Sequence, residues 1–98
     1  MLKNKESLST SLICQGTGNI VSNMENEKVL LSVKNSKYYN LGGVGGAIWD
    51  LIEKPLTLNN IVSSLMCEYD IDYTKCEDQV ITFLEILSIE GLIELKEN

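Results

Sequence analysis

The first half of the chain carries short apolar runs that are typical of strands, and the second half carries apolar residues at helical spacing. The runs are rich in Val, Ile, Leu and Tyr, and polar turns separate them. The predicted strands are residues 9–14, 19–24, 28–33 and 37–41, with turns at residues 25–27 and 34–36. The last three of these strands predict a small antiparallel meander.

Two helices are predicted after a glycine-rich break at residues 42–46. The first runs from about Val44 to Pro55, and Trp49 is expected to anchor it in the core. The second has Thr57 as its expected N-cap, because a threonine hydroxyl can accept a hydrogen bond from an N–H group of the first turn. Their apolar stripes are Val44, Ile48, Leu51 and Ile52 for the first helix, and Leu58, Ile61, Val62, Leu65, Met66 and Tyr69 for the second.

A third helix is predicted after the polar connection at residues 70–72. Thr74 and Glu77 have the spacing of a capping box, which would open this helix, and Gly91 is placed to end it as the C′ residue. Its expected core stripe is Val80, Phe83, Leu84 and Leu87, and Leu92, Ile93 and Leu95 are expected to pack back onto the core. A three-stranded antiparallel meander followed by three helices predicts an α+β, winged-helix-like fold.

Composition restricts the functions that this fold can serve. The chain of 98 residues fits one domain, with residues 19–98 as its body and residues 1–18 as an N-terminal extension or extra strand. The net charge of −6 argues against nucleic-acid binding, which needs Lys and Arg to neutralise phosphates. No apolar run reaches the length of about 18–20 residues that crosses a membrane, and no signal-peptide core is visible. We therefore expect a soluble, cytoplasmic protein that binds neither nucleic acid nor membrane.

Catalytic and metal-binding chemistry has little support in this sequence. The chain has no histidine, which removes the commonest general base and metal ligand. Cys14, Cys67 and Cys76 include no CxxC pair, and we interpret them as small apolar residues kept reduced in the cytosol. The GGVGG segment lacks the phosphate-loop pattern and more simply allows a sharp strand-to-helix turn. We expect no cofactor, no metal and no enzymatic activity.

The order of these motifs resembles the PqqD-like family, the leader-peptide recognition elements of ribosomal peptide biosynthesis. The similarity covers about residues 19–95 and rests on YYNLGGVGGAIW, the EYD-I-D connection and the final EGLI. The first of these segments most resembles stand-alone proteins of lasso-peptide clusters. Family members usually have Asn where Gly42 stands in this chain.

The resemblance implies a role and a set of partners. Proteins of this kind bind the leader region of a precursor peptide and present it to modifying enzymes. In the lasso-peptide case these enzymes are a cysteine leader peptidase and an ATP-dependent macrolactam synthetase. Another peptide-modification pathway, or a quinone-cofactor pathway, is an alternative within the family.

The resemblance also points to the edge of the third meander strand as the peptide-binding site, since an extended peptide can add to an open strand edge. Tyr38 and Tyr39 point to opposite faces there, so that one packs inward and the other can contact a peptide. The third helix offers an opposing flank with residues at helical spacing. The candidate peptide-binding residues are Lys37, Tyr38, Tyr39, Asn40, Cys76, Gln79, Phe83 and Ile86.

Two other classes of function remain open from the sequence. A winged-helix transcription regulator would have a similar order of elements but would need a basic recognition helix. A thiol enzyme would use Cys76 as its nucleophile.

Overall fold

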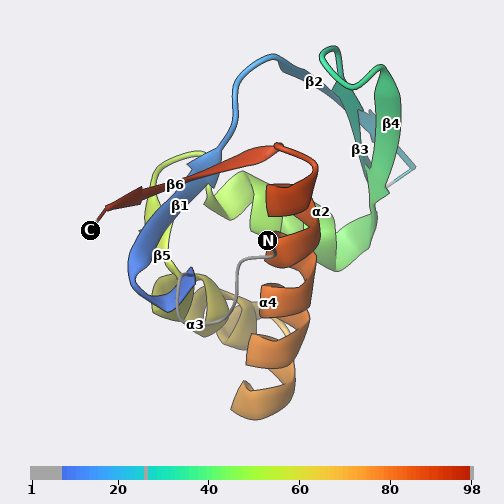
Figure 1. The fold of residues 1–98 in the computed structure, drawn as a ribbon. Helices are drawn as coiled ribbons and strands as arrows, with labels where there is room; N and C mark the ends of the chain where they lie inside the picture. Colours follow the sequence, from blue (N-terminus) through green and yellow to red (C-terminus); the bar gives the residue numbers. More distant parts are fainter. Residues whose placement is uncertain (1–7, 26, 98) are drawn as a thin grey trace.

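The computed structural model describes residues 8–25 and 27–97, so the predictions that fall on residues 1–7, 26 and 98 lie outside the described residues. Figure 1 shows two separate sheets, with α2 running from the end of one sheet to the other. The elements are β1 (Ser11–Gln15), β2 (Asn19–Met24), β3 (Glu27–Ser32), β4 (Lys37–Leu41), α2 (Gly42–Leu51), β5 (Leu56–Thr57), α3 (Leu58–Glu68), α4 (Tyr73–Ile89) and β6 (Ile93–Glu97).

The predicted meander is confirmed as the antiparallel sheet β2-β3-β4. The strand β3 occupies residues 27–32, one residue earlier at each end than the sequence predicts. In the turn before β4, Ser36 has a positive φ of 55°. The backbone N–H of Asn35 donates to the hydroxyl of the buried Ser32, at 3.1 Å, which fixes this turn.

A second sheet, β5-β1-β6, is absent from the sequence-based prediction. Its central strand, β1, overlaps the predicted strand at residues 9–14 but is shifted to Ser11–Gln15. Its neighbours are a two-residue strand, β5, and the C-terminal strand β6. The predicted return of the C-terminal segment to the core is confirmed, because Leu92 and Ile93 are buried and Leu95 packs against the core.

The strand β1 is joined to both α2 and the end of α4 by hydrogen bonds. The side-chain amide of Gln15 donates to the carbonyl of Trp49 at 2.7 Å, and its backbone N–H donates to the carbonyl of Ile52 at 3.0 Å. The backbone N–H of Gly16 donates to the carbonyl of Leu92 at 2.8 Å. A Cβ atom on Gly16 would lie 2.8 Å from that same oxygen, so the close approach requires glycine.

The first helix begins two residues earlier than predicted, at Gly42. Gly42 has a φ of +73°, which a glycine adopts at no steric cost. Its backbone N–H donates to the side-chain oxygen of Asn40 at 2.9 Å. The predicted role of the glycines in a sharp strand-to-helix turn is therefore confirmed. The helix also ends at Leu51, before Pro55 is reached.

One of the two predicted N-caps of the other helices is confirmed, and the other is wrong. Thr57 caps α3, accepting the N–H of Asn60 at 3.2 Å, as predicted. The predicted capping box at Thr74 is wrong, because Asp72 is the N-cap of α4 and accepts the N–H of Lys75 at 3.2 Å. An aspartate before the first turn competes successfully for the same backbone donors.

The end of α4 follows the prediction. Gly91 has a φ of +74° and donates its N–H to the carbonyl of Ser88, while Leu92 donates to the carbonyl of Leu87. This pair of hydrogen bonds is a Schellman motif with Gly91 at C′. The motif turns the chain back so that β6 can join β1.

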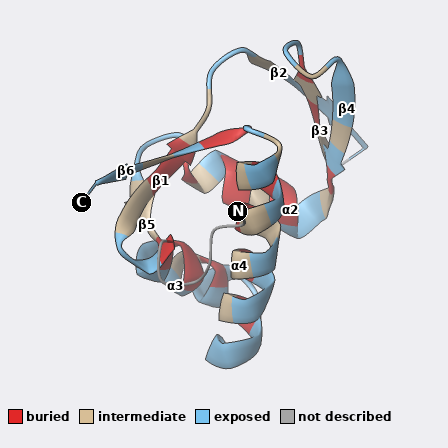
Figure 2. Cartoon of the chain, in the orientation of Figure 1, coloured by how far each residue is buried: buried red, intermediate tan, exposed pale blue. Residues whose placement is uncertain are grey.

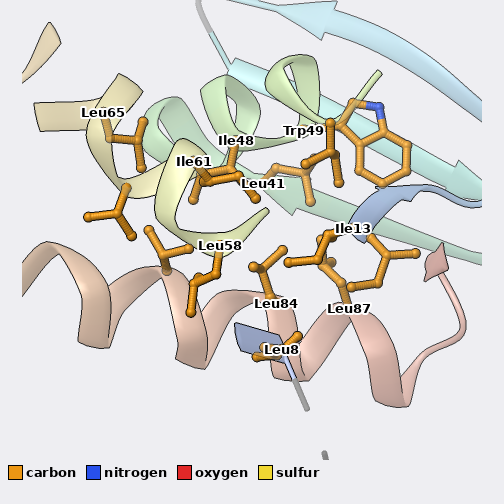
Figure 3. Close-up of a cluster of buried hydrophobic side chains, with 14 of the residues drawn as sticks. Leu8, Ile13, Leu41, Ile48, Trp49, Leu58, Ile61, Leu65, Leu84 and Leu87 are labelled. Carbon is orange, nitrogen blue, oxygen red and sulfur yellow. The ribbon is translucent and has the colours of Figure 1, made fainter. Parts of the chain in front are cut away.

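The core lies between the helices and β1. Figure 2 marks the buried residues along the ribbon, and Figure 3 shows some of their side chains. The α3 stripe is buried from Leu58 to Leu65, but Met66 and Tyr69 are exposed, so the prediction of a longer buried stripe is wrong. Trp49 is buried, as predicted. Val44 was also predicted to face the core, but it is exposed.

We expect the substitution Gly16→Ala to lower the free energy of unfolding by about 1–3 kcal/mol, because the new methyl group would collide with the carbonyl of Leu92. Denaturant unfolding followed by the fluorescence of Trp49 measures this difference. Gly43→Ala is the matched control, since a Cβ atom there meets nothing within 4 Å. Equal stability of the two variants would contradict the prediction.

Candidate peptide-binding site

One edge of β4 is open. Among the described residues, β3 is the strand that pairs with β4, and nothing pairs with its other edge. An open edge presents unpaired N–H and C=O groups, which form a template for a further extended segment. Figure 1 shows β4 at the side of the sheet, with the β2-β3-β4 sheet standing apart from α3.

The four candidate residues of β4 have different surroundings. Tyr38 is 74% exposed, whereas Tyr39 is half-buried and packs against the core. Lys37 is exposed. The side-chain N–H of Asn40 donates to the carboxylate of Glu27 at 3.0 Å, and the side-chain oxygen of Asn40 accepts the backbone N–H of Gly42. Asn40 therefore stabilises the turn from β4 into α2.

Tyr39 takes part in a hydrogen-bonded group, which we call the tyrosine clamp, made of Asn35, Tyr39 and Glu90. The hydroxyl of Tyr39 donates to the carboxylate of Glu90 at 2.6 Å. The amide of Asn35 donates to the Tyr39 hydroxyl at 3.1 Å and to the backbone carbonyl of Glu90 at 2.8 Å. The clamp therefore ties the start of β4 to the end of α4.

The hydrogen bond to Glu90, together with partial burial, raises the pKa of Tyr39 above its ordinary value of 10.0. The neutral phenol is the form that donates to the carboxylate, and an ionised phenol beside Glu90 would be repelled. The clamp is consequently intact at neutral pH.

Phe83 connects the other end of β4 to α4. A Cβ atom on Gly45 would lie 2.8 Å from Cε1 of Phe83 and 3.3 Å from Cβ of Leu41. The phenylalanine ring thus rests on the bare backbone of α2, next to the last residue of β4. This contact and the clamp place α4 antiparallel to β4.

The remaining candidate residues of α4 differ in how far they reach the surface. Gln79 and Ile86 are exposed, with Ile86 at 53%, and Phe83 is half-buried. Cys76 is buried, but its side chain lines a small surface cavity together with Gln79. The structure therefore places Phe83 near the end of β4, whereas Gln79 and Ile86 lie on the exposed surface of α4 and Cys76 is buried beneath it.

Sequence reasoning missed three residues around that cavity: Val44, Tyr69 and Ile71. Val44 and Tyr69 follow the apolar spacing of their helices, and this spacing predicts burial. Whether Val44 and Tyr69 are exposed depends on where the helices end relative to one another. The apolar spacing along each helix does not predict this exposure.

The surroundings of Cys76 do not suit a thiol nucleophile. Burial raises the pKa of its thiol above the ordinary value, which favours the neutral form at neutral pH. The thiol donates a weak hydrogen bond to the carbonyl of Val62, 3.9 Å from the sulfur. Within residues 8–25 and 27–97, no group of three Cys, Asp or Glu side chains is placed to hold a metal ion. No helix there has the length and apolarity needed to cross a membrane.

The described residues form a small α+β domain in which β4 is an edge strand. The sequence profile of the family described as coenzyme PQQ synthesis protein D (PqqD) matches residues 27–93. The chain belongs to the PqqD family. None of the curated protein sequences matches it.

Solved structures with the same fold include complexes with leader peptides. The chain is 28% identical to TbiB1, solved in complex with the TbiA(beta) leader peptide, with a TM-score of 0.75 over 83% of this chain and 94% of that one. A lasso peptide synthetase B1 complexed with the leader peptide is 17% identical, with a TM-score of 0.73 over 84% and 96% of the two chains.

A third similar structure is the PqqD truncation of Methylobacterium extorquens PqqCD, described as a stand-alone recognition element for ribosomally synthesised and post-translationally modified peptides (RiPPs). It is 20% identical, with a TM-score of 0.73 over 96% of this chain and 95% of that one. The predicted family and fold are therefore confirmed.

We expect Tyr39→Phe to be less stable than the wild type at pH 7–9, because it lacks the hydroxyl of the clamp. The raised pKa means that the folded protein holds the phenol proton more tightly than the unfolded chain. This stabilisation is complete below pH 10.0 and is lost as the pH rises through the folded-state pKa, so the difference between the two proteins should shrink. Urea unfolding of both proteins from pH 7 to above pH 10.0 measures the difference and its loss. Tyr38→Phe is the control, and an equal loss in both variants would contradict the role of the clamp.

We expect Gly45→Ala to displace the ring of Phe83 with a change in unfolding free energy of at most about 1 kcal/mol. The half-buried ring can swing outward, and the gain in helix propensity, about 1 kcal/mol, offsets the cost of moving it. Phe83 is the single phenylalanine of the chain, so its ring signals in NMR spectra are unambiguous. Gly43→Ala is the control and should leave the contacts between the ring of Phe83 and Leu41 intact. Intact contacts in Gly45→Ala as well would show that the close approach is not obligatory.

Proposed function

We propose that this protein is a non-catalytic adaptor that binds the leader region of a ribosomally made precursor peptide by adding it as a strand to β4. The observation that carries the proposal is the open edge of β4 beside the apolar flank of α4. Support comes from the similar structure of TbiB1, which was solved with a leader peptide bound. Lys37 to Asn40 are the strand positions of this site, and Cys76, Gln79, Phe83 and Ile86 are its helix positions.

Backbone pairing alone cannot account for such binding. Four or five hydrogen bonds at about 0.5–1.5 kcal/mol each give only a few kcal/mol, against an association cost of about 4–15 kcal/mol. Apolar side chains of the peptide must therefore be buried as well, at about 1.5–3 kcal/mol for each fully buried side chain. Phe83 and Ile86 supply an apolar wall for them, and Tyr38 lies on the strand itself.

The site geometry favours a pre-formed groove. The tyrosine clamp fixes one end of β4 relative to α4, and the contact of Phe83 with Gly45 fixes the other. A groove that is already held in place loses less conformational entropy on binding. The leader can then be bound without remodelling of the adaptor.

The bound leader would be presented to a cysteine leader peptidase and an ATP-dependent macrolactam synthetase, in a lasso-peptide pathway of the cytoplasm. In this proposal the body of the adaptor is residues 19–98, and β1 adds a strand from the preceding segment. A carrier role in a quinone-cofactor pathway is the alternative, supported by the description of the family as a PQQ synthesis protein. A DNA-binding role has weaker support, since α4 carries one lysine, Lys75, and three acids, Glu77, Asp78 and Glu85.

The experiment is a titration with a fluorescein-labelled synthetic peptide that covers the leader of the precursor encoded beside this gene. We expect Ile86→Asp to weaken binding about ten- to a hundredfold, because a charged side chain would replace part of the apolar wall. Ile20→Asp is the matched control, since Ile20 is 54% exposed and Ile86 53% exposed, and Ile20 lies on β2, the far strand of the sheet. Fluorescence anisotropy gives the dissociation constants.

Circular dichroism of both variants establishes that they are folded. Failure of the wild type to bind any leader from its gene neighbourhood would refute the adaptor role. Binding of a quinone-cofactor precursor, with no binding of a lasso leader, would favour the alternative pathway.

A further inference from the structure

The strand β2 forms a second open edge of the meander sheet. Among residues 8–25 and 27–97, β3 is the strand that pairs with β2, and nothing pairs with the opposite edge of β2. The pairing with β3 runs without a bulge from Asn19↔Ser32 to Met24↔Glu27. Every residue of β2 after Asn19 is exposed. The strand therefore presents an uninterrupted edge of unpaired backbone N–H and C=O groups.

The strand β2 also lacks the features that protect an exposed edge. Such edges are usually very short, or they carry charged side chains, a proline or a bulge, which prevent pairing with another chain. The sequence of β2, NIVSNM, has six residues and contains neither a charge nor a proline. The other edge strands are protected, because β4 begins with Lys37, β5 has two residues and β6 carries three charged side chains.

The side chains along this edge are largely apolar and exposed. Ile20 and Met24 are 54% and 61% exposed and point to the same face of the sheet. This is the face away from the core, because the buried Leu30 pairs with Val21, which points to the other face. Val21 itself is 41% exposed. Apolar surface of this kind marks a site of protein–protein contact more often than it marks free surface.

The distribution of charge favours a second copy of this chain as the occupant. The chain has a net charge of −6, so two copies repel each other in most orientations. Like charges directly opposite each other also destabilise a strand pair. Because β2 carries no charge, two copies can pair along it without bringing carboxylates face to face.

The order of residues in β2 is self-complementary about Ser22. When a two-fold axis passes between two antiparallel copies at Ser22, Ile20 of each copy lies opposite Met24 of the other. Directly opposite side chains have Cβ atoms about 4.5–5.5 Å apart, so each apolar pair is in contact. In the same register, Val21 lies opposite Asn23. The two most exposed apolar side chains of β2 are thus covered together.

We propose that this protein forms a symmetric homodimer by antiparallel pairing of β2 with β2 of a second copy, with Ser22 on the two-fold axis. The two three-stranded meanders become one continuous sheet, with a β4 strand at each outer edge. Both β4 edges stay open, so the dimer does not depend on leader binding. A contact between two six-residue strands is smaller than the roughly 1,200–2,000 Å² of a stable interface, and the dimer is therefore concentration-dependent.

Disulfide trapping tests the pairing and its register. The variants are made in the Cys67→Ser background, because Cys67 is exposed whereas Cys14 and Cys76 are buried. With oxidised glutathione, Ser22→Cys should give a disulfide-linked dimer on a non-reducing gel. Opposite residues of an antiparallel pair have Cα atoms about 4.5–5.5 Å apart, which suits a disulfide.

Asn23→Cys is the matched control for the register. It is the next residue of the same exposed strand, but it lies opposite Val21 of the second copy and should stay monomeric. A mixture of Val21→Cys and Asn23→Cys, in the same background, should form the disulfide that neither variant forms alone. Equal trapping of Ser22→Cys and Asn23→Cys would overturn the proposed pairing.

Sedimentation velocity of the protein without added cysteines measures the association up to about 1 mM, which detects dissociation constants in the millimolar range or below. Met24→Asp should raise the dissociation constant about tenfold or more, because it brings charge into each apolar pair. Ile89→Asp is the control, since Ile89 is 63% exposed and lies on α4. Added salt should strengthen the dimer, because it screens the repulsion between two acidic chains.

The outcomes separate the dimer from the adaptor function. A monomer at all concentrations, with no Ser22→Cys disulfide, would overturn the dimer and leave leader binding at β4 unaffected. If Ile20→Asp weakens binding of the labelled leader as much as Ile86→Asp does, the leader occupies the edge of β2 and the dimer proposal also fails. A wild type that dimerises but binds no leader would uphold the dimer and refute the adaptor.

Discussion

The close approach of the ring of Phe83 to the bare backbone of Gly45 joins α4 to α2 at the point where β4 ends. Gly46 allows a second close approach, because a Cβ atom there would lie 3.0 Å from Cβ of Lys28 on β3. The two glycines let α2 lie close to both the sheet and α4. Larger side chains at these positions would displace the ring of Phe83 and the side chain of Lys28 from the surface of α2.

The tyrosine clamp performs the corresponding task at the other end of β4. It links residues that are distant in the chain, since Tyr39 and Glu90 are separated by 51 positions. The Schellman motif at Gly91 places Glu90 for this contact, because it fixes the direction in which α4 ends. Local helix-ending chemistry therefore contributes to the shape of a site formed by distant elements.

Local patterns predicted the meander, the three helices, the Thr57 cap and the Gly91 end, because each depends on a few neighbouring residues. The sheet β5-β1-β6 escaped prediction, since its strands are short and are stabilised by partners far along the chain. Of the candidate residues, Tyr39 and Phe83 contact the core near the ends of β4, and that placement depends on tertiary packing. The exposure of Val44 could not be predicted, because its helical spacing is that of a core residue and tertiary packing determines what covers it. Asp72 and Thr74 offered two possible caps, and spacing alone did not decide between them.

Strand addition is largely independent of sequence, because it uses backbone groups that every peptide has. An adaptor that depended on β4 alone would bind many extended peptides weakly and could not select its own precursor. Selection must come from side-chain sites, and the wall of Phe83 and Ile86 accepts a range of apolar shapes because it is open to solvent.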